Sequence, residues 1–383
     1  MKHYLWHRFV FSFLRYTAGP IVKRSMGYSY SRRKGPEAPS LIIANHNCNL
    51  DPPLVGLAFS KQMYYISSEH SLRDGFSSTL LKFLFDPIAI NKTRADISSI
   101  KEMIRRLKAG ANVCLFAEGD RSFTGVTAPV SPSTAKLAKA SGADLVTFRI
   151  EGGYFTTPRW APNKRKGRMH GSFVGRYKAA ELKQMTEKQI LEAIDRDIFE
   201  DAYERQKASP SRYRGKNLAE SIEIVLYACP GCGKIGTIRS EGDRFFCGCG
   251  LSGAYTETGL LEGEALPFHT ITEWGRWQEG QLAAIIGKAG GDPVCSDEGQ
   301  QLFKVQAAVG KTPVGEGKMF IGRDVFHCAG MGFPLEQMTR ISVVGQMTLL
   351  FGTADGAEYE VRSPVPRSAL KYRDAFRLLT GKS

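Results

Sequence analysis

Short apolar runs alternate with segments of helical spacing between residues 40 and 150. The apolar runs predict buried strands at residues 41–44, 63–66, 87–90, 113–116 and 145–150. Residues 96–109 carry isoleucine and leucine at helical spacing and stop at Gly110, and a second helix is predicted at 133–141. Strands and helices at these distances indicate an α/β fold with a mostly parallel central sheet flanked by helices.

The pattern changes twice in the second half of the chain. One long helical pattern covers residues 186–206, and the Ser-Pro-Ser sequence at 209–211 marks a boundary after it. Residues 260–383 consist of glycine-punctuated short runs, with a hairpin signal at 355–356, and they end in an amphipathic helix from about 367 to 379. We expect a β-rich, barrel-like domain there, and the order resembles, in pattern only, the pleckstrin-homology-like superfold.

Residues 1–30 combine aromatic and basic side chains, and no acidic residue precedes Glu37. Such a segment is typical of an amphipathic helix in the interface of an anionic membrane, although a helix packed on the body through its aromatics is the alternative. No signal-peptide pattern is evident at the N-terminus, and no run of about 18 uncharged apolar residues occurs, so we expect no transmembrane helix. We therefore expect a peripheral, monotopic protein on the cytoplasmic side of the cell membrane.

Composition and net charge limit the classes of binding partner that fit this protein, but they do not select one. Hydrophobic residues make up 42% and charged residues 23%, as in folded proteins, whereas the net charge of +14 favours polyanions. Nucleic acid, anionic lipid and phosphorylated substrates all fit that charge. Four of the eight cysteines lie in one stretch, which indicates a metal site in a reducing compartment.

The segment from Asn45 to Asp51 follows the first predicted strand, at the edge where open α/β sheets place their sites. His46 can take a proton near neutral pH, and Asp51 is close enough along the chain to orient its ring. This pair is a base for deprotonating a substrate hydroxyl, and it needs no serine nucleophile. Alone, a histidine–aspartate pair at this spacing is a weak signal.

A second polar turn follows the strand at 113–116. Gly119 permits a sharp turn, Arg121 offers a forked donor for phosphate oxygens, and Glu118 can order the loop by accepting backbone or Arg121 hydrogen bonds. The alternative is a tight turn with a surface ion pair. Since both turns follow strands, they are expected to open on the same edge of the sheet.

These two segments resemble the first and third blocks of the glycerolipid acyltransferase superfamily, which includes 1-acylglycerol-3-phosphate acyltransferases. The first block, Asn-His-x4-Asp, is matched in full, and the third, Phe-Pro-Glu-Gly-Thr-Arg-Ser, is matched apart from Ala117 and Asp120. The matching residues are Asn45, His46, Asp51, Phe116, Glu118, Gly119, Arg121 and Ser122. The resemblance covers about residues 35–155, and we assign the acyltransferase domain to 31–215.

The resemblance also implies roles. His46 would be the general base and Asp51 its orienting partner, while Asn45, Glu118, Gly119, Arg121 and Ser122 would bind the acceptor. The second block supplies a basic residue, and Lys92 or Arg94 stands at its place. The fourth block normally has valine and proline, but threonine follows Val146 here. The residues at 117, 120 and 147 depart from the family pattern. The identity of the acceptor is therefore less well defined by the resemblance than the type of reaction.

A basic cluster lies beside Trp160, at Arg159, Lys164, Arg165, Lys166 and Arg168. It fits lipid headgroups, an acidic acyl carrier protein, or simply an exposed loop.

The cysteine stretch resembles the two knuckles of a zinc ribbon at residues 222–257. Cys229, Cys232, Cys247 and Cys249 would hold a structural Zn²⁺, although the second knuckle has one intervening residue instead of two. An iron site is the alternative, and disulfides fit a reducing compartment less well. Few basic residues flank it, so we expect a folding or docking module and no nucleic-acid partner.

The predicted function is therefore acyl transfer from acyl carrier protein or coenzyme A to 1-acylglycerol 3-phosphate, in phospholipid synthesis at an anionic membrane surface. Glycerol 3-phosphate or another lysolipid is the alternative acceptor. A non-catalytic lipid-binding scaffold is the alternative outside enzymes.

Overall fold

The computed structural model describes residues 3–31, 39–72, 76–91, 97–306 and 310–382. The chain forms two compact units, which we describe separately. The first comprises Met1–Asn91, Asp96–Arg159 and Lys164–Arg214, and the second includes Trp160–Asn163 and Gly215–Ser383.

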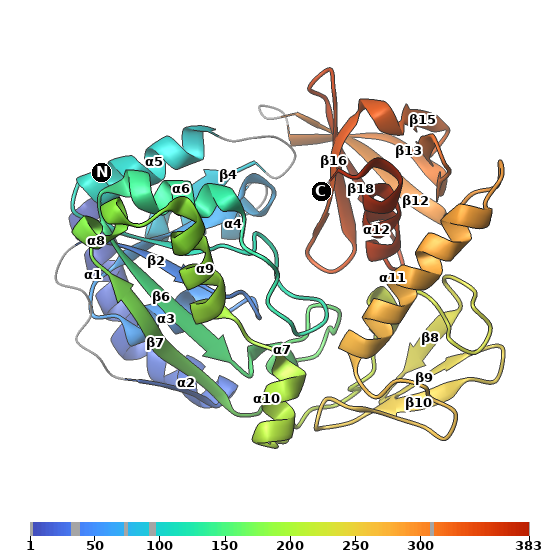
Figure 1. The fold of residues 1–383 in the computed structure, drawn as a ribbon, viewed down its shortest axis with the longest axis horizontal. Helices are drawn as coiled ribbons and strands as arrows, with labels where there is room; N and C mark the ends of the chain where they lie inside the picture. The colour runs from blue at the N-terminus through green and yellow to red at the C-terminus, as the bar shows by residue number, and fades with distance from the viewer. Residues whose placement is uncertain (1–2, 32–38, 73–75, 92–96, 307–309, 383) are drawn as a thin grey trace. The chain divides into compact units, whose positions relative to one another are not determined.

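The first unit is built on a seven-stranded sheet with the order β1-β7-β6-β2-β5-β3-β4 (Figure 1). The strands are β1 (Tyr28–Tyr30), β2 (Ser40–Ala44), β3 (Met63–Ser68), β4 (Ile88–Ile90), β5 (Asn112–Phe116), β6 (Asp144–Glu151) and β7 (Met169–Tyr177). Neighbouring strands are parallel except for β6 and β7. The mostly parallel sheet predicted from the sequence is thus confirmed, and β1 and β7 are the strands that the apolar runs did not indicate.

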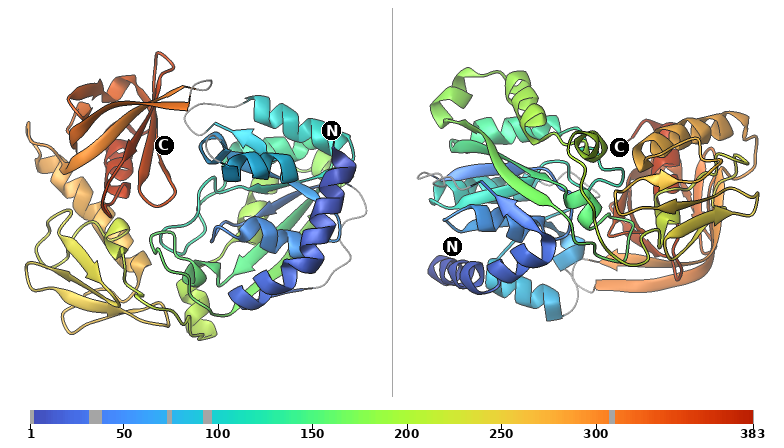
Figure 2. Two further views of the ribbon diagram at one scale, coloured as in Figure 1. Left: turned by 180° about the vertical axis from the view of Figure 1, so that it is seen from behind. Right: turned by 90° about the horizontal axis from the view of Figure 1, so that it is seen from below.

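Helices cover both faces of this sheet (Figures 1 and 2). They are α1 (Tyr4–Thr17), α2 (Gly19–Met26), α3 (Asp51–Ala58), α4 (Phe76–Phe85), α5 (Ile97–Lys108), α6 (Pro132–Ser141), α7 (Gly153–Thr156), α8 (Ala179–Gln184), α9 (Glu187–Ile198) and α10 (Ala202–Ala208). Successive residues of β2 serve opposite faces. Leu41 and Ile43 belong to the core that contains residues of α5, α6 and α9. Ile42 and Ala44 pack with residues of α2 and α3.

The predicted single helix over residues 186–206 is wrong, because the chain forms two helices, α9 and α10. Thr186 caps α9 in a capping box with Gln189. Asp201 caps α10 by accepting the N–H groups of Tyr203 and Glu204. The break between the helices lets the side chain of Glu200 turn into the interior, where it is 4% exposed.

The N-terminal segment also forms two helices, with Pro20 in the first turn of α2. Large apolar side chains of α1 and α2 remain exposed, namely Leu5, Trp6, Phe9, Phe13, Tyr16 and Ile21. Only His7 and Val10 of α1 are fully buried. Among the described residues, no helix has both the length and the apolar character needed to cross a membrane.

The second unit contains a four-stranded sheet and a seven-stranded antiparallel sheet. The small sheet consists of β8 (Ile238–Glu241), β9 (Arg244–Cys247), β10 (Ser252–Tyr255) and β11 (Leu261–Glu262). The large one consists of β12 (Cys295–Gln306), β13 (Gly310–Ile321), β14 (Val325–Cys328), β15 (Met331–Pro334), β16 (Met338–Val344), β17 (Thr348–Thr353) and β18 (Glu358–Arg362), and α12 (Leu370–Thr380) follows it. The β-rich character is confirmed, and the predicted hairpin joins β17 and β18.

The prediction of short strands and one final helix for this region is incomplete, because α11 (Ile271–Lys288) precedes the large sheet. Trp274 on α11 is fully buried, as expected of a core residue, and donates its indole N–H to the carbonyl of Ala228 at 2.8 Å. The side-chain amide of Gln278 donates to the carbonyl of Val225 at 2.8 Å and accepts the backbone N–H of Tyr227 at 3.0 Å. The helix therefore fixes the cysteine-bearing segment through buried polar contacts.

Candidate active site

His46 lies two residues after the end of β2, and Asp51 is the first residue of α3. The Nδ1 atom of His46 is 2.8 Å from Oδ2 of Asp51, and the histidine side chain is 22% exposed while the aspartate is fully buried. The imidazole stacks on Phe116 at a centroid distance of 4.5 Å. Its Nε2 atom bonds no residue that the structure describes. The pair is thus held on one side of the ring and open on the other.

The surroundings of Asp51 decide which way that hydrogen bond runs. Its Oδ2 atom also accepts the backbone N–H groups of Asn47 and Cys48, at 2.6 and 2.8 Å. The thiol of Cys48 donates to Oδ1 at 2.9 Å. A carboxylate with this set of donors accepts from His46 as well, so Nδ1 carries the proton and Nε2 presents its lone pair.

Glu118 ties the two sequence blocks together. One carboxylate oxygen accepts the backbone N–H of His46 at 2.6 Å, and the other accepts that of Ala128 at 2.8 Å. Burial raises the pKa of Glu118 to about 8, although these two hydrogen bonds oppose the shift. As expected, β2 and β5 are neighbours and their loops open on the same edge of the sheet. Glu118 thus orders the His46 loop through its backbone.

Arg121 supplies positive charge beside the pair. Its side chain makes no hydrogen bond or ion pair with any described residue. Burial lowers the pKa of Arg121, while the charge of the nearby Asp51 opposes that shift. Gly119 has φ +73°, a backbone conformation that favours glycine, and its Cα faces open space. Arg121 is therefore available for an anionic ligand.

The side chains of Asn45 and Ser122 form hydrogen bonds with nearby backbone groups. Asn45 exchanges two hydrogen bonds with Ile150 on β6, at 2.7 and 2.8 Å, and is fully buried. The hydroxyl of Ser122 donates to the carbonyl of Val126 and accepts the N–H of Gly125, both at 2.8 Å. Their side chains are thus engaged within the protein. The substrate-binding role that the resemblance implies for both stays a prediction.

The basic cluster near Trp160 does not form one exposed surface. Arg159 and Arg165 are 2% and 1% exposed. Arg159 lies over the ring of Phe123 at 4.0 Å, donates to the carbonyl of Arg121 at 2.9 Å, and reaches Asp120 at 3.5 Å. This arginine supports the loop of the third block instead of facing a partner.

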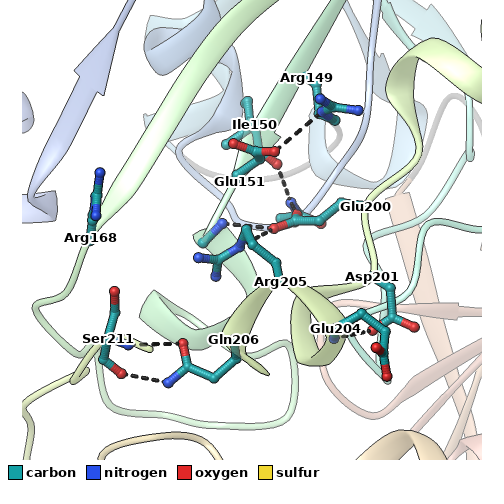
Figure 3. Close-up of polar contacts among 12 residues, drawn as sticks. Arg149, Ile150, Glu151, Arg168, Glu200, Asp201, Glu204, Arg205, Gln206 and Ser211 are labelled. Atoms are coloured by element: carbon teal, nitrogen blue, oxygen red, sulfur yellow. Dashed lines mark hydrogen bonds and ion pairs between the residues drawn. The ribbon is translucent and has the colours of Figure 1, made fainter. Parts of the chain in front are cut away.

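A buried network behind the His46 loop was missed from the sequence. Glu200 accepts hydrogen bonds from Nδ2 of Asn47 at 2.5 Å and from the N–H of Gly152 at 2.8 Å. It also accepts one from Nε of Arg205 at 3.0 Å (Figure 3). Burial raises its pKa to about 7, against the effect of Arg205. The only sequence signal is the pair of acids at 200–201 within an otherwise helical pattern. Lys92 and Arg94, the predicted second-block residues, lie outside the described residues.

The four clustered cysteines come together in the second unit. Their sulfur atoms all lie within 4.8 Å of one another, including those of the short second knuckle. Tetrahedral Zn²⁺ with a Zn–S length of about 2.3 Å requires sulfurs about 3.8 Å apart. The distances are 3.6 Å for Cys229–Cys249 and 3.9 Å for Cys232–Cys247. This donor set can hold a metal ion with four thiolates and no open position.

Part of the first unit matches a known protein family. Residues 25–151 match the family model described as Acyltransferase, and this stretch contains His46, Asp51, Glu118 and Arg121. Among solved structures, the chain is similar to the 1-acyl-sn-glycerophosphate (LPA) acyltransferase PlsC from Thermotoga maritima. The sequence identity is 16%, the TM-score is 0.41, and the match covers 49% of this chain and 78% of that one.

Proposed function

We propose that this protein transfers a fatty acyl group from a thioester to the hydroxyl of 1-acylglycerol 3-phosphate at an anionic membrane surface. The observation that carries the proposal is the His46–Asp51 pair, with Nε2 open, beside an Arg121 side chain that bonds no described residue. The match of residues 25–151 to the acyltransferase family model supports the reaction type. The choice of acceptor rests on Arg121 and on the resemblance of the sequence blocks, and glycerol 3-phosphate or another lysolipid is the alternative.

The proposed chemistry uses His46 twice. Nε2 removes the proton of the acceptor hydroxyl while its oxygen attacks the thioester carbonyl carbon. Asp51 stabilises the imidazolium that forms. When the tetrahedral intermediate collapses, the carbon–sulfur bond breaks, the ester remains on the acceptor, and the imidazolium returns its proton to the thiolate. Arg121 would bind the acceptor's phosphate through its forked donors.

Direct attack by the acceptor is favoured over an acyl-enzyme. Cys48 is fully buried, its thiol is bonded to Asp51, and burial raises its pKa, so it is a poor nucleophile. The hydroxyl of Ser122 is engaged at both its donor and acceptor positions.

Membrane attachment is proposed through the exposed apolar side chains of α1 and α4. The ring centroids of Trp6 on α1 and Phe83 on α4 are 5.7 Å apart. The side chains of Phe9 and Phe83 are 61% and 63% exposed. No acidic residue occurs in α1 or α2 to repel anionic lipid.

The test is acyl transfer by the purified protein on vesicles, with acyl-coenzyme A or acyl carrier protein as donor and 1-acylglycerol 3-phosphate, glycerol 3-phosphate or other lysolipids as acceptor. His46→Ala is expected to lose at least about 100-fold in rate, the scale of a missing general base. Cys48→Ser is the matched control, because serine can still donate to Asp51, and its rate should stay within about threefold.

Two outcomes would contradict the proposal. Unchanged turnover in His46→Ala would exclude the histidine as the base. No transfer to any acceptor, with vesicle binding intact, would favour the lipid-binding scaffold instead.

A further inference from the structure

The first unit has a cavity whose lining includes none of the residues assigned to the proposed reaction. Its volume is about 230 Å³, and it is lined by Glu151, Arg168, His170, Arg205 and Ser209. Glu151 ends β6, Arg168 and His170 lie at the start of β7 or just before it, and Arg205 and Ser209 lie in α10 and just after it. Gln206 holds the chain after α10 through bonds of 2.6 and 3.2 Å to Ser211, which fixes the wall near Ser209 (Figure 3).

Glu151 and His170, two other residues of the lining, already have partners. Glu151 lies 3.4 Å from Nε of Arg149. The ring nitrogens of His170 contact the hydroxyls of Ser29 and Ser31, at 2.8 and 3.3 Å. The lining therefore carries two guanidinium groups against one carboxylate, and that carboxylate is paired with Arg149.

Arg205 is held rigidly but keeps donors free. Its Nε bonds Glu200 and its Nη2 bonds the hydroxyl of Tyr213, both at 3.0 Å, and the side chain is 18% exposed. A guanidinium has five N–H donors, so three of them make no bond to a described residue. Glu200 in turn accepts from Asn47, so the cavity meets the His46 loop through two hydrogen bonds.

Arg168 faces the same cavity without a partner. Its side chain makes no hydrogen bond or ion pair with any described residue, and Figure 3 draws it apart from the dashed network. Two guanidinium groups around one small cavity, one of them fixed in place, suit the oxygens of a phosphate group.

We propose that this cavity binds a phosphate group through Arg168 and Arg205, separately from the acceptor phosphate assigned to Arg121. Free phosphate and the headgroup of a membrane phospholipid offer the same chemistry. The cavity is smaller than pockets for drug-sized ligands, which start at about 300 Å³, and fits a small anion or headgroup.

The test is calorimetric titration of the purified protein with inorganic phosphate at constant ionic strength. Wild-type protein should show saturable binding, and Arg168→Ala should weaken it at least about tenfold, because charge-assisted hydrogen bonds are lost. Lys166→Ala is the matched control: it removes the same charge two residues away, from a side chain that does not line the cavity. It should change affinity by less than about twofold.

Absence of saturable binding, or equal weakening by both variants, would overturn the proposal. Arg121→Ala separates it from the proposed function, since that variant should lose acyl transfer but keep Arg168-dependent phosphate binding. Phosphate binding that requires Arg121 and ignores Arg168 would refute the cavity and place the anion at the reaction site.

A second arm identifies the source of the phosphate. Co-sedimentation with phosphatidylcholine vesicles, with and without phosphatidic acid, is compared for the same variants. A loss of phosphatidic-acid-dependent binding in Arg168→Ala supports a headgroup ligand. Retained vesicle binding together with lost inorganic phosphate binding supports a soluble one.

Discussion

Two buried carboxylates, Asp51 and Glu200, and the partly buried Glu118 surround the His46 loop, and each is matched to donors. Asp51 accepts two backbone N–H groups, Glu118 accepts one N–H on each oxygen, and Glu200 accepts three donors in all. Buried polar groups need such partners. An amide has a single acceptor oxygen, so replacement of Glu118 or Glu200 by glutamine places an NH₂ group against an N–H donor.

The raised pKa of Glu118 predicts that the free energy of unfolding falls as the pH rises. Its pKa is raised from the ordinary 4.5 to about 8, so the folded state retains a proton that the unfolded chain has lost. The contribution of Glu118 to the free energy of unfolding is therefore present below pH 4.5 and is lost as the pH rises to about 8.

Urea denaturation at several pH values checks this prediction. Glu118→Gln should be less stable overall, and its deficit relative to wild type should shrink as the pH rises from 5 to 8. Glu192→Gln, at a carboxyl with 63% side-chain exposure on α9, is the control and should show no such trend. A deficit that is constant over this range would show that Glu118 does not titrate there.

At the residue scale, the sequence indicated the local pair but not its distant supports. Asp51 is five positions from His46, so their contact could be expected from the spacing, while the role of Asp51 stays a prediction. Glu200 lies 153 positions from Asn47, and the turn that directs it inward has neither glycine nor proline to mark it. Only the fold brings these two side chains together.

At the scale of elements, α1 and α4 share an exposed apolar surface. The rings of Trp6, Phe9 and Phe13 follow one another along α1, with centroid distances of 5.9 and 6.1 Å, and Phe83 of α4 extends the row. The sequence predicted the contribution of α1 from its aromatic and basic composition. The contribution of α4 was not predicted, because residues 76–85 carry no comparable charge pattern.

This arrangement predicts that α4 takes part in membrane binding. Full burial of a phenylalanine contributes about 1.5–3 kcal/mol, so Phe83→Ser should weaken binding to anionic vesicles about five- to tenfold if the ring inserts in part. Phe199→Ser, which removes a ring of 50% exposure from the end of α9, serves as the control. Co-flotation with vesicles provides the measurement, and equal partitioning of the two variants would exclude α4 from the surface.

The strands that are buried on both faces could be predicted from the sequence, because hydrophobic burial alone decides their pattern. The strands at 41–44 and 113–116 are continuous apolar runs and are buried on both faces, so their type was evident. Helix α11 was missed because glycines at 275, 280 and 287 resemble turn signals. Its helical state follows from packing of Trp274 and Gln278 against a segment about 50 residues earlier, including a 2.8 Å bond across 46 positions.

At the scale of the whole molecule, the cysteine cluster is joined to the rest of the second unit. Besides the contacts of α11, the hydroxyl of Tyr227 donates to Asp374 of α12 at 3.1 Å. A metal held by the four thiolates would therefore stabilise more than the small sheet beside it.

We predict one Zn²⁺ per chain, measurable by elemental analysis of the purified protein. Cys232→Ser should lose the metal and lower the melting temperature, as a strong chelator should for wild type. Cys328→Ser, which alters a buried thiol outside the cluster, should keep the metal. Full metal content in Cys232→Ser would rule out the four-cysteine site.

The long sequence separation between Glu200 and Asn47 also has a consequence for synthesis of the protein. During translation, the loop bearing His46 leaves the ribosome long before its partner at position 200, which is 153 residues from Asn47. The nascent chain can pair β2 with β5 as soon as residue 116 has emerged. The loop that bears His46, however, gains the hydrogen bond from Asn47 to Glu200 only after residue 200 has emerged. On the proposed mechanism, a chain that ends before residue 200 is therefore expected to lack a fully ordered site.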